Sequence, residues 1–319
     1  MSSKDAAIAL SVLMPAFNAG RFLQEAINSV RAQTWPHWTL WIIDDGSTDG
    51  SGALMDAAAR EDPERIRVLR HENCGMGESL NRALAVASTE WVARMDADDV
   101  MFPERLSRQI DFLNQHPDIS VTSCLAVYMD SQGRSFGRTA SELLSPQAFD
   151  RALRTGEAIG LLHPGVVMRR EAALGVGGYR GQFWPADDID LWARLAEAGH
   201  RILVQPETLM AYRLHEESVI TSQFRAGRLQ YDWVRACMAA RRRRQPEPSR
   251  EIFLAEREKA PWGVKLQRER KLLAKQLYRQ AGQDHLNGRR VQALAAMAGA
   301  ALLQPRYTLT RLRRQWTIS

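Results

Sequence analysis

Three aspartates stand within four positions in DADD (96–99), directly after the apolar run WVARM (91–95). Carboxylates repel one another, so such a group either lies in water at a turn or surrounds a positive charge. Oxygen ligands suit Mg²⁺ and Mn²⁺, which usually combine few carboxylates with substrate phosphates. Asp96 and Asp98 are two apart at a strand exit, so both side chains can lean to one side. These residues predict a divalent-cation site for a diphosphate, or a solvated turn before Pro103.

Two further acidic segments occupy positions where chemistry is expected. DDGSTDG (44–50) follows the apolar run LWII (40–43), and DDIDLWARL (187–195) opens a helical pattern. Asp, Gly and Ser are also ordinary turn residues, and acidic residues at a helix start are also favoured by the helix dipole. Taken singly, each segment is open to a purely structural interpretation.

Alternating strands and helices must position these acidic groups. Continuous apolar runs predict strands at 8–15, 40–43, 66–69 and 91–95. Apolar residues at helical spacing predict helices at 22–33, 51–60, 77–88 and 103–116. This alternation predicts an α/β fold with a mostly parallel sheet flanked by helices, in which ligands bind at the carboxyl ends of the strands.

Charge divides the chain into two parts. The 319 residues suffice for one large domain or for a domain with an appendage. Residues 1–224 carry 21 basic and 30 acidic residues, a net charge of −9, whereas residues 225–319 carry 22 and 7, a net charge of +15. We predict an acidic domain over 1–224 and a basic helical region over 225–319, with a break at RRRRQPEP (241–248) and helices at 264–281 and 289–303.

The cysteines and the apolar segments indicate the cellular compartment of the protein. Neither paired nor metal-type spacing is found among Cys74, Cys124 and Cys237, which favours a reducing compartment. Residues 4–17 resemble a signal peptide, but Asp5 interrupts the pattern and no small-residue cleavage site follows. The longest apolar tract, at 293–303, is too short to span a bilayer. We predict a cytoplasmic protein, with peripheral attachment to the inner face of the membrane as an open alternative.

Seven short motifs occur in one order between residues 8 and 220. They are PAFN (15–18), DDGSTD (44–49), NCGMGESLN (73–81), DADD (96–99), HPGVVMRR (163–170), GGY (177–179) and DDIDLWARL (187–195). Together they resemble the inverting, nucleotide-sugar-dependent glycosyltransferases of family two, which have the GT-A fold, a Rossmann-like sheet flanked by helices. The resemblance covers about two thirds of the chain and leaves out the basic region. It implies transfer of a sugar from a nucleotide-diphosphate donor, expected to be a UDP-sugar, to a hydroxyl of a glycan or lipid-linked acceptor.

The same resemblance implies which residues bind the nucleotide. Pro15, Phe17 and Asn18 match the segment that holds the base. Phe17 keeps an aromatic ring but lacks the hydroxyl of the Tyr that usually stacks there. Asp45 is similar to the carboxylate that reads the base edge, and Asp96 to the one that contacts the ribose.

Metal binding and catalysis are implied for a second set of residues. Asp98 is similar to the ligand of a divalent cation, Mn²⁺ or Mg²⁺, and His215 to a histidine that some members place beside the metal. Asp188 matches the catalytic base, while Asp187 replaces the usual Glu and is expected to support it. In an inverting transfer, a base that removes the acceptor's proton typically contributes ~10²–10⁴-fold, and a metal neutralises the leaving diphosphate.

Three other functions fit the sequence less well. A sugar-nucleotide pyrophosphorylase needs a Gly-rich, basic loop after the first strand, and PAFNAGRFL (15–23) offers little of this. A catalytically inactive transferase-like scaffold acting through its basic tail is disfavoured by the presence of Asp98 and Asp188. A Rossmann dehydrogenase is excluded, because no G-x-G-x-x-G follows the first strand.

The basic region admits two interpretations. Leu309, Leu312 and Trp316 fall at helical spacing with arginines between them, a pattern typical of a helix lying on an anionic membrane surface. The alternative is a solvated basic face that packs on the acidic domain. No aromatic-studded platform for single strands is found, so no nucleic-acid partner is expected.

Overall fold

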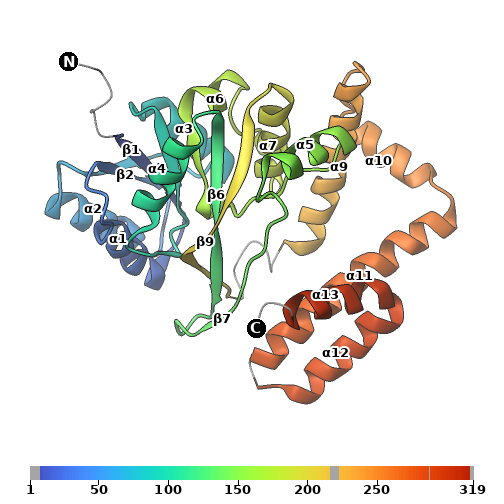
Figure 1. The fold of residues 1–319 in the computed structure, drawn as a ribbon. Coiled ribbons are helices and arrows are strands. Elements are labelled where there is room, and N and C mark those ends of the chain that lie inside the picture. The colour runs from blue at the N-terminus through green and yellow to red at the C-terminus, as the bar shows by residue number, and fades with distance from the viewer. Residues whose placement is uncertain (1–7, 216–222, 287, 317–319) are drawn as a thin grey trace.

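The computed structural model describes residues 8–215, 223–286 and 288–316. Figure 1 shows an α/β domain whose central sheet is flanked by helices, followed by an all-helical C-terminal region. The strands are β1 (Leu10–Ala16), β2 (Trp38–Asp44), β3 (Ile66–Arg70), β4 (Trp91–Arg94), β5 (Val100–Met101), β6 (Ile119–Met129), β7 (Ser135–Arg138), β8 (Val167–Arg169) and β9 (Arg201–Arg213). The domain helices are α1 (Leu23–Arg31), α2 (Ser51–Glu61), α3 (Met76–Val86), α4 (Arg105–Gln115), α5 (Pro146–Thr155), α6 (Arg170–Gly175) and α7 (Asp187–Glu197), with 3₁₀ turns η1 (Gly20–Phe22), η2 (His163–Gly165) and η3 (Gly181–Phe183).

The sheet runs in the order β3-β2-β1-β4-β8-β6-β9-β5, with β7 paired to β6. Strands β1 to β4 are parallel, as the alternation predicts. Beyond β4 the sheet is mixed, because β8 is antiparallel to β4 and β6, and β5 is antiparallel to β9. The prediction of parallel pairing therefore holds for β1 to β4 and for the β6–β9 pair, while the other pairs are antiparallel. Strands β5 and β8 are entered from a turn and from η2 rather than from a crossover helix.

Apolar patterning explains the elements that carry the site. Every residue of β1 is buried, as expected for a continuous apolar strand covered on both faces. In α4 the predicted face of Leu106, Ile110 and Leu113 is buried. The helix begins at Arg105 rather than at Pro103, which lies in the turn before it.

The C-terminal region continues from the domain through α9 (Phe224–Arg242) and α10 (Arg250–Lys259). A second apolar cluster joins Phe183 and Ala193 of the domain to Trp233 and Val234 of α9 and Phe253 of α10. The break predicted at 241–248 separates α9 from α10. It is followed by α11 (Trp262–Leu286), α12 (Arg290–Leu303) and α13 (Pro305–Trp316), of which the first two were predicted.

Helices α11 to α13 form a bundle at the far end of the molecule (Figure 1). Among the described residues, no helix combines the length and apolar character needed to cross a bilayer. The side chains of Leu312 and Trp316 lie outside the described ones, so the surface-helix interpretation of α13 stays a prediction.

Candidate active site

The DADD segment leaves β4 at the carboxyl edge of the parallel half of the sheet. Carboxylate oxygens of Asp96, Asp98 and Asp99 lie within 4.8 Å of one another. His215, just past the end of β9, brings its Nε2 to 2.9 Å from Asp98 Oδ2. The two residues predicted as metal ligands therefore meet, although 117 positions separate them.

Arg94, the last residue of β4, supplies a buried positive charge beneath this cluster. Arg94 is 2% exposed, and its guanidinium forms an ion pair with Asp96. Burial raises the pKa of Asp96, and Arg94 opposes that rise. Sequence reasoning missed Arg94, although an arginine inside the apolar run WVARM was a visible signal.

Asp99 lies deepest in the cluster. Its Oδ1 accepts a hydrogen bond from the Arg213 backbone N–H at 2.7 Å, while its buried Oδ2 has no hydrogen-bond partner among the described residues. Burial, with the carboxylates of Asp98 and Asp96, raises the pKa of Asp99 well above its usual value. The carboxylate oxygens of the cluster and the imidazole nitrogen of His215 are ligand types that fit a divalent cation such as Mn²⁺ or Mg²⁺.

Asp45 holds the loop that follows β3. Its Oδ1 accepts from the Cys74 N–H at 2.7 Å, and its Oδ2 accepts from the Gly75 N–H at 3.0 Å. The neighbouring Asp44 instead accepts from Ser47 N and pairs with Arg70. Of the two adjacent aspartates, Asp44 therefore stabilises the turn that follows β2, and Asp45 binds the 73–75 loop.

The PAFN segment reaches the same edge. Asn18, in the left-handed region at φ 49°, accepts from Thr48 N at 2.8 Å and donates its own N–H to Ser47 Oγ at 3.1 Å. Pro15 is buried in β1, opposite Ile43 of β2. Phe17 is 52% exposed, so its ring is free to stack on a planar group.

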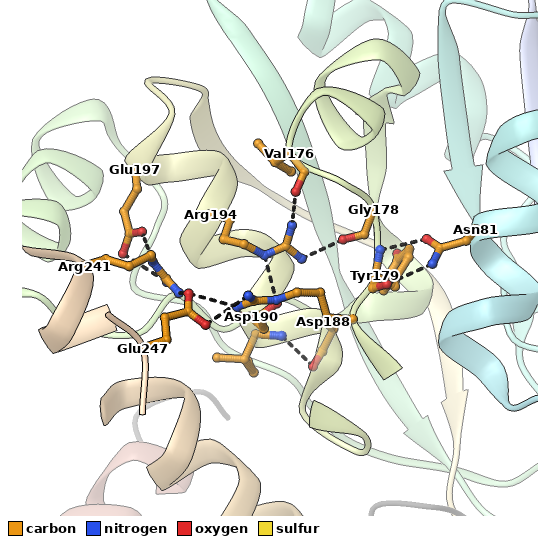
Figure 2. A network of polar contacts seen from close by, with 12 residues as sticks. Asn81, Val176, Gly178, Tyr179, Asp188, Asp190, Arg194, Glu197, Arg241 and Glu247 are labelled. Carbon is orange, nitrogen blue, oxygen red and sulfur yellow. Dashed lines mark hydrogen bonds and ion pairs between the residues drawn. The ribbon is translucent and has the colours of Figure 1, made fainter. Parts of the chain in front are cut away.

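Asp187 and Asp188 begin α7 on another side of the site. A Cβ at position 77 would lie 2.8 Å from Asp187 Oδ2, so a larger residue in place of Gly77 would displace this carboxylate. That oxygen is buried and unpartnered within the described part of the chain. Asp188 is partly exposed, and its Oδ1 accepts from the Ile189 N–H at 2.7 Å (Figure 2).

The pKa values of Asp187 and Asp188, the first two residues of α7, are both raised toward neutrality. Burial raises the pKa of Asp187 to about 6. Burial and the charge of Asp187 raise the pKa of Asp188 to about 7. Arg94 lowers both values and that of Asp96, so a single buried cation influences the DADD cluster and the α7 pair.

Figure 2 shows the ion-pair network behind Asp188. The buried Asp190 carboxylate accepts from Arg180 Nε at 2.8 Å and from Arg194 Nε at 2.9 Å. Arg180 also donates to Glu247 at 3.0 Å, and Glu247 in turn accepts from Arg241 of α9. The start of α7 is thereby tied to the segment between α9 and α10, a link that no sequence pattern indicated.

The GGY and HPG motifs meet at the same place. Asn81 of α3 holds Tyr179 by accepting from its N–H at 2.7 Å and donating to its carbonyl at 2.8 Å. The Tyr179 hydroxyl lies 2.8 Å from His163 Nε2. Burial, then Arg94, lowers the pKa of His163 well below its usual value, so this ring is neutral. The motifs that carried the resemblance thus converge, and His163 is a site neighbour that sequence reasoning left without a role.

The α/β fold is that of the GT-A class. Two solved structures share the fold. One is S. aureus TarS in complex with UDP-GlcNAc, with a TM-score of 0.59, 17% identity, and coverage of 94% of this chain and 83% of that one. The other is the mannosyltransferase PcManGT from Pyrobaculum calidifontis, in complex with GDP-Man and Mn2+, with a TM-score of 0.53, 19% identity, and coverage of 98% and 83%.

Sequence comparison defines the family. The family model for "Glycosyl transferase family 2" matches residues 11–176, just over half of the chain. The Bacillus subtilis protein described as glycosyltransferase EpsE is 31% identical over 212 residues, covering 66% of this chain and 73% of that relative. The amylovoran biosynthesis glycosyltransferase AmsE of Erwinia amylovora is 26% identical over 211 residues, covering 66% and 77%. The chain belongs to glycosyl transferase family 2.

Proposed function

We propose that the protein is an inverting glycosyltransferase that moves a sugar from a nucleotide-diphosphate donor, a UDP-sugar, to a hydroxyl of a glycan or lipid-linked acceptor. The observation that carries this proposal is the pairing of two acidic sites around one buried arginine. Asp98 with His215 forms the first site, and Asp187 with Asp188 forms the second. An inverting displacement needs such a division, because leaving-group charge and acceptor proton develop on opposite sides of the sugar.

Five residues would bind the nucleotide at the carboxyl edge of β1, β2 and β4. The exposed Phe17 ring offers a stacking face for the base, with Pro15 and Asn18 shaping the loop around it. Asp45 would accept from the base edge while its backbone bonds keep the carboxylate in place. Asp96, fixed by Arg94, would accept from the ribose.

Asp98 and His215 would hold the divalent cation, Mn²⁺ or Mg²⁺. When bound, that cation supplies neutralisation of the charge on the diphosphate leaving group. The protein's own contribution is to position the ligand atoms. Asp98 and His215 already lie at 2.9 Å, and Asp99 keeps β9 in register by accepting from Arg213.

Asp188 would act as the general base. The acceptor's O–H proton passes to its carboxylate, the acceptor oxygen bonds to the anomeric carbon, and the bond from that carbon to the diphosphate oxygen breaks. A pKa of about 7 matches proton transfer near neutral pH, and partial exposure leaves the group accessible to an acceptor. Asp187, more deeply buried, would support it by raising that pKa.

We further propose a cytoplasmic protein that attaches peripherally to anionic membranes through its basic C-terminal helices. The support is the net charge of +15 over residues 225–319 and the attraction of anionic lipid for Lys and Arg. A lipid-linked acceptor would then be met at the membrane surface.

The proposed donor is tested by a thermal-shift screen of UDP-, GDP- and dTDP-sugars with and without Mn²⁺. A ligand that binds only the native state adds about 2.7 kcal/mol to the free energy of unfolding at one hundred times its Kd, and so raises the melting temperature. We expect UDP-sugars with Mn²⁺ to give the largest shift. The absence of any shift with all three nucleotides would overturn the proposal.

A further inference from the structure

A second set of metal-ligating side chains lies beside the proposed base pocket, apart from the DADD cluster. Ligand atoms of Asp45, His71 and Cys74 lie within 4.8 Å of one another. His71 Nδ1 is 3.3 Å from Asp45 Oδ1 and 3.4 Å from Cys74 Sγ. The side chains of Asp45 and His71 are each only 6% exposed, whereas Cys74 faces solvent. The cluster therefore has two fixed ligands and one side open for entry.

The spacing of these atoms matches a tetrahedral transition-metal site. With bond lengths of about 2.3 Å to sulfur, 2.0 Å to nitrogen and 2.1 Å to oxygen, a tetrahedron has a nitrogen–oxygen edge of about 3.4 Å and a nitrogen–sulfur edge of about 3.5 Å. The observed separations of 3.3 and 3.4 Å differ from these edges by about 0.1 Å. Two of the three ligand–ligand edges therefore fit a tetrahedral cation, and the third, between the Asp45 carboxylate and Cys74 Sγ, lies within 4.8 Å.

The ligand types also separate this cluster from the oxygen-rich one at Asp98. Thiolate and imidazole favour Zn²⁺ and its neighbours among the transition metals, whereas carboxylates favour Mg²⁺ and Mn²⁺. Three protein ligands leave a fourth position for water. His71 Nδ1 also lies 2.9 Å from the carbonyl oxygen of Glu72, which accepts a hydrogen bond from it in the tautomer that carries the proton on Nδ1.

We propose that Asp45, His71 and Cys74 form a binding site for a thiophilic divalent cation of the Zn²⁺ type. A cation bound at this site would exclude the donor nucleotide. The exclusion rests on the proposed function, since both ligands require the Asp45 carboxylate. On binding, the Cys74 thiol releases one proton to solvent, and the imidazole proton of His71 moves from Nδ1 to Nε2. No oxidation or reduction takes place. The cation therefore acts as a reversible inhibitor at the base pocket.

The test uses Co²⁺ as a spectroscopic probe of the full chain, with Mg²⁺ in large excess to occupy the Asp98 site. We expect a sulfur-to-cobalt charge-transfer band that saturates at one equivalent. The band should be lost in Cys74→Ser and kept in Cys237→Ala, a control that removes a thiol of α9 buried in the second apolar cluster. A missing band, or an equal band in Cys74→Ser, would overturn the proposed site.

The exclusion is tested by competition with UDP. At Zn²⁺ ten times above its own Kd, the apparent Kd of UDP should rise about tenfold in wild type, and clearly less in Cys74→Ser. If UDP binds by calorimetry but leaves the cobalt band unchanged, Asp45 is not shared and the exclusion is refuted. If UDP does not bind at all while the cobalt band is present, the proposed function fails and the metal site stands.

Discussion

Replacing Asp190 by Asn removes the buried carboxylate that accepts hydrogen bonds from both Arg180 and Arg194. Asp190 is fully buried, and the side chains of Arg194 and Arg180 are 10% and 28% exposed. Loss of one partner from a buried ion pair costs about 3–5 kcal/mol, because the remaining charge is left uncompensated. Arg180 keeps Glu247 and Arg194 keeps the carbonyls of Val176 and Gly178, so we expect the lower end, about 3 kcal/mol.

The matched control is Glu247→Gln, at the rim of the same network. Its side chain is 26% exposed, so we expect a loss of no more than about 1 kcal/mol. Both variants are measured by urea unfolding, with the slope m checked for equality. Because both carboxylates share Arg180, the double variant should deviate from additivity by at least 0.5 kcal/mol, as residues in one network do. Similar losses in the two single variants would refute the assignment of Asp190 as the centre of the network.

Four further outcomes are expected. Asp98→Asn should abolish transfer and weaken UDP binding by calorimetry only when Mn²⁺ or Mg²⁺ is present; equal weakening in EDTA would contradict a metal role. With a pKa of about 7 at Asp188, the single-turnover rate should rise with pH up to about 7 and then level, and a flat profile between pH 5 and 8 would exclude this base. Because this folded-state pKa lies above the unfolded value, stability falls as pH rises between the two, so Asp188→Asn should raise the melting temperature relative to wild type more at pH 8 than at pH 5. Deleting residues 305–319 should release the protein from anionic vesicles while donor hydrolysis persists, and unchanged vesicle binding would favour packing of the basic region on the domain.

The parallel half of the fold was predictable because its strands are continuous apolar runs. β1 and β2 carry almost no polar residue before their carboxyl ends, and the turn residues that follow mark where each strand stops. The short antiparallel strands β5 and β8 were not predictable in the same way. β5 has two residues and β8 has three, so neither presents a period long enough to indicate direction.

The candidate site was predictable where a residue belonged to a compact motif. Asp45, Asp98 and Asp188 stand in such motifs, and the structure places each at the edge or helix start that was expected. Arg94 and Glu247 were missed because their importance comes from contacts across the fold. Arg94 acts on three carboxylates from one buried position, and Glu247 reaches Arg180 from 67 residues away.

The division of labour between donor and acceptor sites is tested most directly by Asp188→Asn, with Asp187→Asn as its neighbour control. Asparagine keeps the size of the side chain and can still accept from the Ile189 N–H, but it cannot take the acceptor's proton. UDP-sugar affinity by calorimetry should stay close to wild type, while single-turnover transfer at saturating donor falls by about two to four orders of magnitude. Asp187→Asn should lose clearly less. Near wild-type transfer by Asp188→Asn with an inactive Asp187→Asn would move the base by one residue, and full activity in both would contradict the account of α7 as the catalytic helix.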